Sequence, residues 1–153
     1  WSCSGSTKLL ASKIARETDA DILEITLRNS YPANYRKTLS RANRERIQND
    51  PPELEMQLPD LSQYDTIYLG YQTWAMTLSQ PMRAFLLEYG GEFFNKKIAP
   101  FLSEGGYGSG DSTELIREFI ARDGGKNKKV DWTFFGPENV LCAGITDKFN
   151  EAG

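Results

Sequence analysis

Hydrophobic positions along the chain switch between helical and strand spacing. Apolar residues that include Leu10 and Ile14 recur at intervals of three and four, which predicts an amphipathic helix over residues 7–17. Alternating apolar residues then predict a strand over residues 21–27. The first part of the chain therefore has a helix followed by a strand.

The next segment is polar, and its charged part is predicted to be a helix that ends near Gln48. The many Arg, Asn and Glu residues of this helix predict a solvated face over one thin apolar stripe. Pro51 and Pro52 follow, and they end any helix because proline lacks the N–H that a helix needs.

The strand and helix pattern then repeats. Residues 65–71 are the clearest candidate for a buried strand, and we expect a loop over residues 72–77 and a helix over residues 79–89. Residues 97–102 predict another strand, which Pro100 should make short or irregular.

The last part of the chain begins with a glycine-rich loop at residues 103–110. Capping residues at positions 111–114 predict the start of a further helix, and apolar runs predict strands at 132–135 and 139–145. Strands and helices that alternate with short loops predict an α/β protein with an open parallel sheet, in a single domain over residues 1–153.

Composition narrows the classes of function. The chain has no histidine, which excludes a His-based acid–base relay and a Ser-His-Asp triad, and we expect neither catalytic residues nor metal ligands. A net charge of −3 gives no electrostatic reason to expect a nucleic acid. No apolar run approaches the ~20 residues of a membrane span, so a soluble protein is expected.

Cysteine usage bears on the compartment. Cys3 and Cys142 are the only cysteines, too few for a disulfide framework, which indicates a reducing compartment such as the cytoplasm. The sequence leaves open whether a signal or an anchor precedes Trp1.

Ligands of open parallel sheets bind at the carboxyl ends of the strands, so the loops that follow strands are the candidate site. Residues 2–7 place four hydroxyl side chains and a glycine before a helix N-terminus, where N–H groups and the helix dipole attract anions. The loop lacks the GK[ST] and GxGxxG patterns. A monophosphate held by hydroxyls and backbone fits it better, and a plain helix cap is equally compatible.

Two further loops offer aromatic side chains. Trp74 comes directly after a predicted buried strand and suits stacking on a planar heterocycle, although a Trp packed on a neighbouring helix is the commoner arrangement. Tyr107, in the loop at residues 103–110, could form a second wall, or that loop could be a plain surface loop. The three loops together favour a phosphate-bearing ligand with a planar ring.

These motifs resemble the flavodoxin-like family, in the branch whose phosphate loop has the form S-x-S-G-x-T. Residues 2–7 match that pattern at every fixed position. The resemblance extends through several later segments in the family's order and thins after Asp123. Those segments are Tyr31-Pro32 with Tyr35, residues 61–71, residues 70–81 and residues 103–110.

The resemblance implies a three-layer open parallel sheet with strand order 2-1-3-4-5, and non-covalent FMN as the cofactor. It implies that the FMN phosphate is held by Ser2, Ser4, Gly5, Ser6 and Thr7. One side of the isoalloxazine would be lined by Gln72, Thr73 and Trp74. Its pyrimidine edge and other side would be covered by Ser103, Glu104, Gly105, Gly106 and Tyr107. The family's first strand precedes the phosphate loop, so we expect the natural protein to carry an apolar strand upstream of Trp1.

The chain departs from the family at four positions of the second loop, which are Gln72, Ala75, Met76 and Ser79 in place of Pro, Trp, Gly and Pro. Loss of the second Trp removes stacking worth ~0.5–1.5 kcal/mol, so weaker flavin binding is expected. Glu104 stands where the family commonly has small or neutral residues, and we expect its side chain to point to water.

Two functions are compatible with the sequence. The first is a redox protein that transfers electrons through FMN, as a carrier or as an NAD(P)H-linked reductase of a small acceptor. Because a net charge of −3 gives little steering, a reductase or a dedicated protein partner is favoured over a general carrier. The alternative is a flavodoxin-fold module that has lost FMN and binds another phosphate ligand or a protein.

Overall fold

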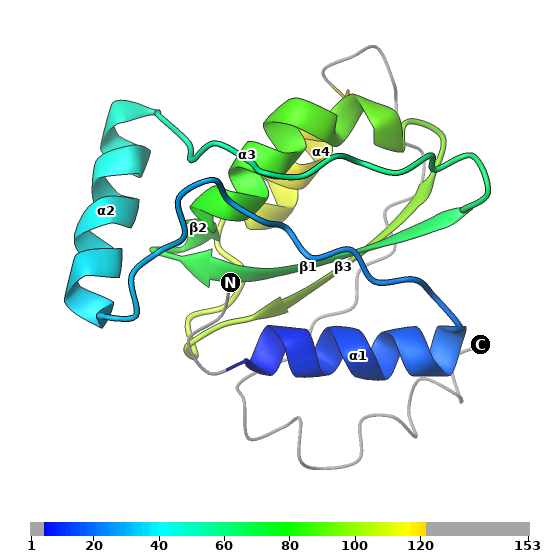
Figure 1. The fold of residues 1–153 in the computed structure, drawn as a ribbon, viewed down its shortest axis with the longest axis horizontal. Helices are drawn as coiled ribbons and strands as arrows, with labels where there is room; N and C mark the ends of the chain where they lie inside the picture. The colour runs from blue at the N-terminus through cyan, green and yellow to red at the C-terminus, as the bar shows by residue number, and fades with distance from the viewer. Residues whose placement is uncertain (1–4, 122–153) are drawn as a thin grey trace.

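The computed structural model describes residues 5–121, in which helices cover both faces of a small sheet. Helix α1 (Ser6–Thr18) lies on one face, and α3 (Gln80–Tyr89) and α4 (Ser112–Ala121) lie on the other (Figure 1). Helix α2 (Tyr35–Gln48) stands at the edge of the molecule, away from these layers. All four helices occur where the sequence predicts them. The strands predicted at 132–135 and 139–145 lie outside the described residues.

The sheet consists of β1 (Thr66–Trp74), β2 (Thr77–Leu78) and β3 (Lys97–Ser103), in the order β2-β1-β3. Strands β1 and β3 are parallel, and their register runs from Thr66 opposite Lys97 to Gln72 opposite Ser103. Helix α3 and the short 3-10 helix η1 (Gly90–Phe93) connect them. The parallel α/β fold is therefore as predicted, and the carboxyl ends of both strands lie side by side.

The second loop is shorter than the sequence suggests. Gln72, Thr73 and Trp74 were expected in a loop, but they are the last residues of β1, because Thr73 and Trp74 pair antiparallel with β2. Ala75 and Met76 alone make the turn, with φ of 51° and 63°. Positive φ at both central residues is the geometry that joins two antiparallel strands most tightly.

Pro100 does not shorten its strand, contrary to expectation. Strand β3 is continuous over seven residues, and Pro100 lies opposite Leu69 of β1. In the described part of the chain, β3 has a strand on one side only. A strand accepts proline at a position whose N–H its described neighbour does not need.

The strand predicted over residues 21–27 is wrong. This segment is extended but makes a single bridge, from Leu27 to Leu54, and none of the described strands of the sheet pairs with it. It bonds instead to the segment around Leu54, where the Glu55 N–H donates to the Thr26 carbonyl at 2.9 Å. Ile22 is accordingly 57% exposed. An alternating pattern forms a strand only where a neighbouring strand supplies hydrogen-bond partners.

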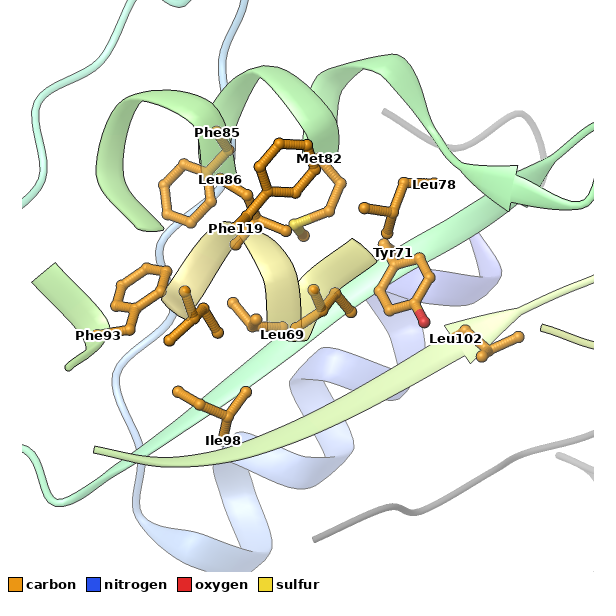
Figure 2. Packing of buried hydrophobic residues seen from close by; sticks show 12 residues of the cluster. Leu69, Tyr71, Leu78, Met82, Phe85, Leu86, Phe93, Ile98, Leu102 and Phe119 are labelled. Atoms are coloured by element: carbon orange, nitrogen blue, oxygen red, sulfur yellow. The ribbon is translucent and has the colours of Figure 1, made fainter. Parts of the chain in front are cut away.

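The main core lies between the sheet and helices α3 and α4 (Figure 2). Leu69 of β1, Leu86 of α3 and Phe119 of α4 are buried there, and Phe93 of η1 closes one end. Full burial of each such side chain is worth ~1.5–3 kcal/mol. On the opposite face α1 forms a smaller cluster, in which Leu10 packs with Phe101 of β3, against Ala11 and Ile14. The helical spacing read from the sequence is the spacing that faces Phe101.

Helix α2 differs in part from its sequence prediction, because its buried side is not the apolar stripe. Its inward side is polar, because Glu45 is only 5% exposed and Thr38 is also buried. Its apolar residues point outward instead, with Tyr35 68%, Leu39 46% and Ile47 77% exposed. The expected solvated charged face is present, because Arg36, Lys37, Arg44 and Arg46 are exposed, but the expected apolar stripe does not face inward.

Candidate functional site

The three predicted loops meet at the carboxyl ends of β1 and β3. Gln72, at the end of β1, lies opposite Ser103, at the end of β3. The Ser103 hydroxyl is in turn 2.7 Å from the hydroxyl of Thr7, in the first turn of α1. A residue from each loop thus lies at one corner of the sheet. Thr7 and Ser103 meet there although they are 96 residues apart in sequence.

Helix α1 begins after a glycine that leaves the backbone at its N-terminus open to a ligand. Gly5 is the N-cap residue, with φ of 76°, and a Cβ there would meet nothing within 4 Å. The glycine is thus required by its backbone angle and not by lack of space. Ser6 and Thr7 are half-buried in the first turn. First-turn N–H groups and hydroxyls of this kind suit a phosphate. Ser2 and Ser4 lie outside the described residues.

Contacts with Tyr31 and Gln72 help to hold Trp74 at the end of β1. Its ring meets the ring of Tyr31 edge to face, with centroids 5.2 Å apart and planes at 88°. Its Nε1–H donates to the side-chain oxygen of Gln72 at 3.2 Å. The half-buried indole therefore has a defined orientation, with Tyr31 as an aromatic partner.

Tyr31 is itself fixed by an ion pair on α2, in which Glu45 is buried and Arg41 is half-buried. The Tyr31 hydroxyl donates to the Glu45 carboxylate, whose other oxygen accepts from Arg41 Nε at 2.6 Å. The Arg41 guanidinium lies over the Tyr31 ring, 4.2 Å from its centroid, and also donates to the carbonyl of Asn29 at 2.8 Å. Burial, with the hydrogen bond to Glu45, raises the pKa of Tyr31 well above its usual range.

Sequence reasoning missed this network. Arg41 and Glu45 are four residues apart on a helix, which is the spacing of an ion pair, but that spacing is usual for solvent-exposed pairs too. Only the contact with Tyr31 shows that the pair faces inward. The Tyr31-Pro32 motif was noted in the sequence, but without this role.

The third loop folds back on its own glutamate. The Glu104 carboxylate accepts hydrogen bonds from the backbone N–H of Gly106 at 2.6 Å and of Gly108 at 2.8 Å. The expectation that Glu104 simply points to water is therefore wrong. Gly105 and Gly106 are exposed, and Tyr107 is 82% exposed at the tip of the loop. Of the residues predicted in this loop, Ser103 meets another predicted loop, whereas Tyr107 extends outward.

The far end of the third loop contacts the turn at Ala75 and Met76. Gly110 has φ of 55°, and a Cβ on it would lie 1.7 Å from the Met76 carbonyl oxygen. The Asp111 N–H donates to that same oxygen at 3.1 Å. Behind this contact the hydroxyls of Tyr71 and Ser112 are 3.0 Å apart. The glycine thus allows the third loop to approach the end of the second.

Among the described residues there is neither a candidate metal site nor a candidate membrane-spanning helix. Residues 5–121 contain no group of three or more His, Cys, Asp or Glu side chains placed to hold a metal ion. Within the same range, every helix is too short or too polar to cross a bilayer.

A sheet with helices on both faces, and a candidate site on the loops after its parallel strands, defines the doubly wound α/β class. A family model described as flavodoxin matches residues 1–130 of this chain. The chain therefore belongs to the flavodoxin family.

Solved structures agree with this fold. A flavoprotein from Lactobacillus acidophilus NCFM, crystallised in complex with FMN, superposes with a TM-score of 0.67 at 21% identity, over 93% of this chain and 91% of that one. A candidate flavoprotein from Bacteroides uniformis ATCC 8492 gives 0.68 at 22% identity, over 95% and 93%. One from Bacteroides eggerthii DSM 20697 gives 0.68 at 19% identity, over 95% and 91%.

Among curated proteins, the chain matches an enzyme over a short segment only. Over 48 residues the chain is 44% identical to phosphoribosylamine–glycine ligase from two Streptococcus pneumoniae strains, R6 and TIGR4. The match covers 28% of this chain and 11% of the ligase. The chain thus spans only a small part of the ligase, and the match carries no argument for ligase activity.

Proposed function

We propose that this protein binds FMN non-covalently and transfers electrons through it. The observation that carries the proposal is the meeting of the three loops, in which Thr7 contacts Ser103 and Ser103 lies opposite Gln72. FMN needs a phosphate site and a flat ring site at one edge of the protein. The described residues fit both needs, with hydroxyls and a helix N-terminus beside an oriented indole.

The phosphate half of the site uses the start of α1. Gly5, Ser6 and Thr7, with Ser2 and Ser4 from the preceding loop, would hold the phosphate through backbone N–H groups and hydroxyls. The positive end of the α1 dipole favours a dianion at this position. Because Thr7 contacts Ser103, the position of this half depends on β3 as well as on α1.

The ring half uses the ends of β1 and β3. Gln72, Thr73 and Trp74 would line one side of the ring, and Tyr31 would hold Trp74 in place. Ser103, Glu104, Gly105 and Gly106 would lie along its polar edge, with Tyr107 on the other side. When bound, FMN supplies the redox chemistry, and the chain's residues set its environment through hydrogen bonds and stacking.

Membership of the flavodoxin family supports this proposal, and so does the FMN complex of the Lactobacillus acidophilus flavoprotein with the same fold. Within it, we propose a role with a dedicated protein partner or as an NAD(P)H-linked reductase. Consumption of NADPH by the FMN-loaded protein in the presence of a quinone separates the two. If the FMN-loaded protein does not consume NADPH in this assay, a role with a dedicated protein partner is favoured.

The first test is the visible absorbance of the concentrated protein, followed by titration with FMN and with riboflavin under flavin fluorescence. We expect saturable quenching at one FMN per chain, and binding of riboflavin weaker by at least about tenfold, because riboflavin lacks the phosphate. Equal affinity for both flavins would contradict the assigned phosphate loop. A protein that ignores both flavins would overturn the proposed function and favour the module without FMN.

A further inference from the structure

The charge of this protein is unevenly distributed. Helix α2 contains five basic residues and one acidic residue, in a chain whose net charge is −3. The acidic residue, Glu45, faces inward and is neutralised by Arg41. Four exposed cations remain on α2. They are Arg36, Lys37, Arg44 and Arg46.

These four cations are available for an external partner. Among the ion pairs of the described residues, the one on α2 joins Arg41 to Glu45, and none includes the four exposed cations. Three large apolar side chains of α2, Tyr35, Leu39 and Ile47, are exposed as well. We call these seven residues the α2 face.

The composition of the α2 face is that of a protein interface. Interfaces are enriched in aromatic residues, methionine and arginine, and their rim is polar. Tyr35 is 68% exposed and Ile47 77% exposed, so both side chains are accessible to a partner. The net charge of −3 therefore conceals a strongly basic local surface.

The α2 face is connected to the proposed flavin site. Helix α2 stands at the edge of the molecule, so a large partner can reach it (Figure 1). From its inner side, Glu45 binds the Tyr31 hydroxyl, and the Tyr31 ring contacts Trp74. A protein bound on the α2 face would therefore be separated from Tyr31 and Trp74 by the thickness of one helix, ~10 Å.

We infer that the α2 face docks an acidic electron-transfer protein. The redox nature of this partner rests on the proposed function, whereas the docking surface itself does not depend on flavin. Four clustered cations favour an acidic partner and speed its association. The expectation that a net charge of −3 gives little steering concerns the whole chain, whereas this proposal concerns one helix.

The arrangement favours a protein over the other polyanions. A helix that lies in a membrane needs a continuous apolar face, but Arg36 projects from the same side of α2 as Leu39 and Ile47. A nucleic acid would use the cations but leave Leu39 and Ile47 without a role. An acidic protein with an apolar centre uses both kinds of side chain.

The test measures binding of an acidic plant-type [2Fe–2S] ferredoxin as a probe, by calorimetry at low and high salt, with the full chain free of flavin. The test variant is Arg36→Gln/Arg44→Gln/Arg46→Gln. The control variant, Arg16→Gln/Arg28→Gln/Arg117→Gln, removes the same charge at exposed arginines elsewhere. We expect the test variant to bind about tenfold or more weakly at low salt, and the control to stay within about twofold of the unmodified chain. Ile47→Ser should weaken binding at both salt concentrations.

Several outcomes would overturn the inference. Equal losses in the two triple variants would mean that net charge matters and α2 does not. Absence of ferredoxin binding, tighter binding to phosphatidylserine vesicles, or self-association through α2 in sedimentation would each exclude an acidic protein as the occupant. Because no flavin is present, these outcomes are independent of whether FMN binds.

Discussion

The hydroxyl of Thr7 on α1 lies 2.7 Å from the hydroxyl of Ser103 at the end of β3. One of the two must donate, so the pair joins a helix on one face of the sheet to the edge where the strands end. This contact makes the proposed phosphate site and ring site parts of one structure. Removal of either hydroxyl should therefore affect flavin binding as well as stability.

We expect Thr7→Val to lower the free energy of unfolding by ~0.5–1.5 kcal/mol, because it leaves Ser103 without this partner. FMN affinity should fall by about tenfold, since a hydrogen bond to a charged phosphate is lost as well. The matched control is Thr18→Val in the same helix, where the hydroxyl donates to the Ile14 carbonyl far from the site. Urea unfolding and FMN titration measure both effects. Equal losses of FMN affinity in the two variants would contradict the role of Thr7.

Tyr31→Phe keeps the ring against Trp74 but removes the hydrogen bond to buried Glu45. We expect this substitution to lower the free energy of unfolding by ~1–3 kcal/mol near pH 8, because the Glu45 carboxylate loses a hydrogen-bond donor. The pKa of Tyr31 is raised in the folded protein, so its neutral form is favoured there. The stability that this form contributes is complete below about pH 10, the pKa of an unfolded tyrosine, and is lost at higher pH.

The difference in stability between the unmodified chain and Tyr31→Phe should therefore shrink as pH rises above about 10. Burial also raises the pKa of Tyr71, so both proteins will lose stability in alkali, and the measured quantity is the difference between them. Urea unfolding at several pH values provides it. A difference that is constant across this range would show that Tyr31 is not held neutral by the fold.

Gly70 has a close neighbour on the adjacent strand. A Cβ on Gly70 would lie 2.3 Å from the Phe101 ring, which is buried and packs with Leu10. We expect Gly70→Ala to cost ~1–3 kcal/mol, and Phe101→Leu to recover part of this loss in the double variant. The control is Gly105→Ala, where a Cβ meets nothing within 4 Å. Thermal unfolding is the measurement, and a neutral Gly70→Ala would mean that the ring moves freely.

Substitutions in the turn at Ala75 and Met76 should stabilise the protein. Both residues have positive φ, which is costly for side chains other than Asn or Gly. We expect Ala75→Asn/Met76→Gly to raise the free energy of unfolding by ~1–2 kcal/mol, since Asn-Gly is the preferred pair for such a turn. Asn95→Gly, at φ of 64°, should change little because Asn already tolerates that region. No gain in unfolding experiments would contradict the assigned turn geometry.

Glu104 should order the third loop. We expect Glu104→Ala to speed hydrogen exchange at Gly106 and Gly108 by about tenfold, because each N–H loses a charged acceptor. Glu104→Gln should have a smaller effect, since its amide oxygen still accepts. Glu118→Ala, an exposed glutamate on α4, is the control. Exchange at the two glycines that is unchanged in Glu104→Ala would show that the carboxylate does not hold the loop.

The hydrophobic pattern of the sequence predicted those elements whose structure depends on their own residues. The spacing of Leu10 and Ile14 predicted α1 and its buried side, and the apolar run before Gln72 predicted β1. The same local signals placed two loops after strands, and residues 2–7 match the phosphate motif of the flavodoxin family. For these elements, hydrophobic period and capping chemistry are properties of a few consecutive residues.

The tertiary structure decided everything that depends on a partner distant in sequence. Residues 21–27 alternate as a strand should, but they lack a described neighbour in the sheet. Glu45 is buried because Tyr31 and Arg41 satisfy its charge, and Thr7 meets Ser103 because α1 and β3 pack together. Such contacts are set by which surfaces the packed core brings together. By itself, therefore, the sequence determined the elements, their order and the family, while tertiary packing determined which side chains share the site and which face of α2 remains exposed.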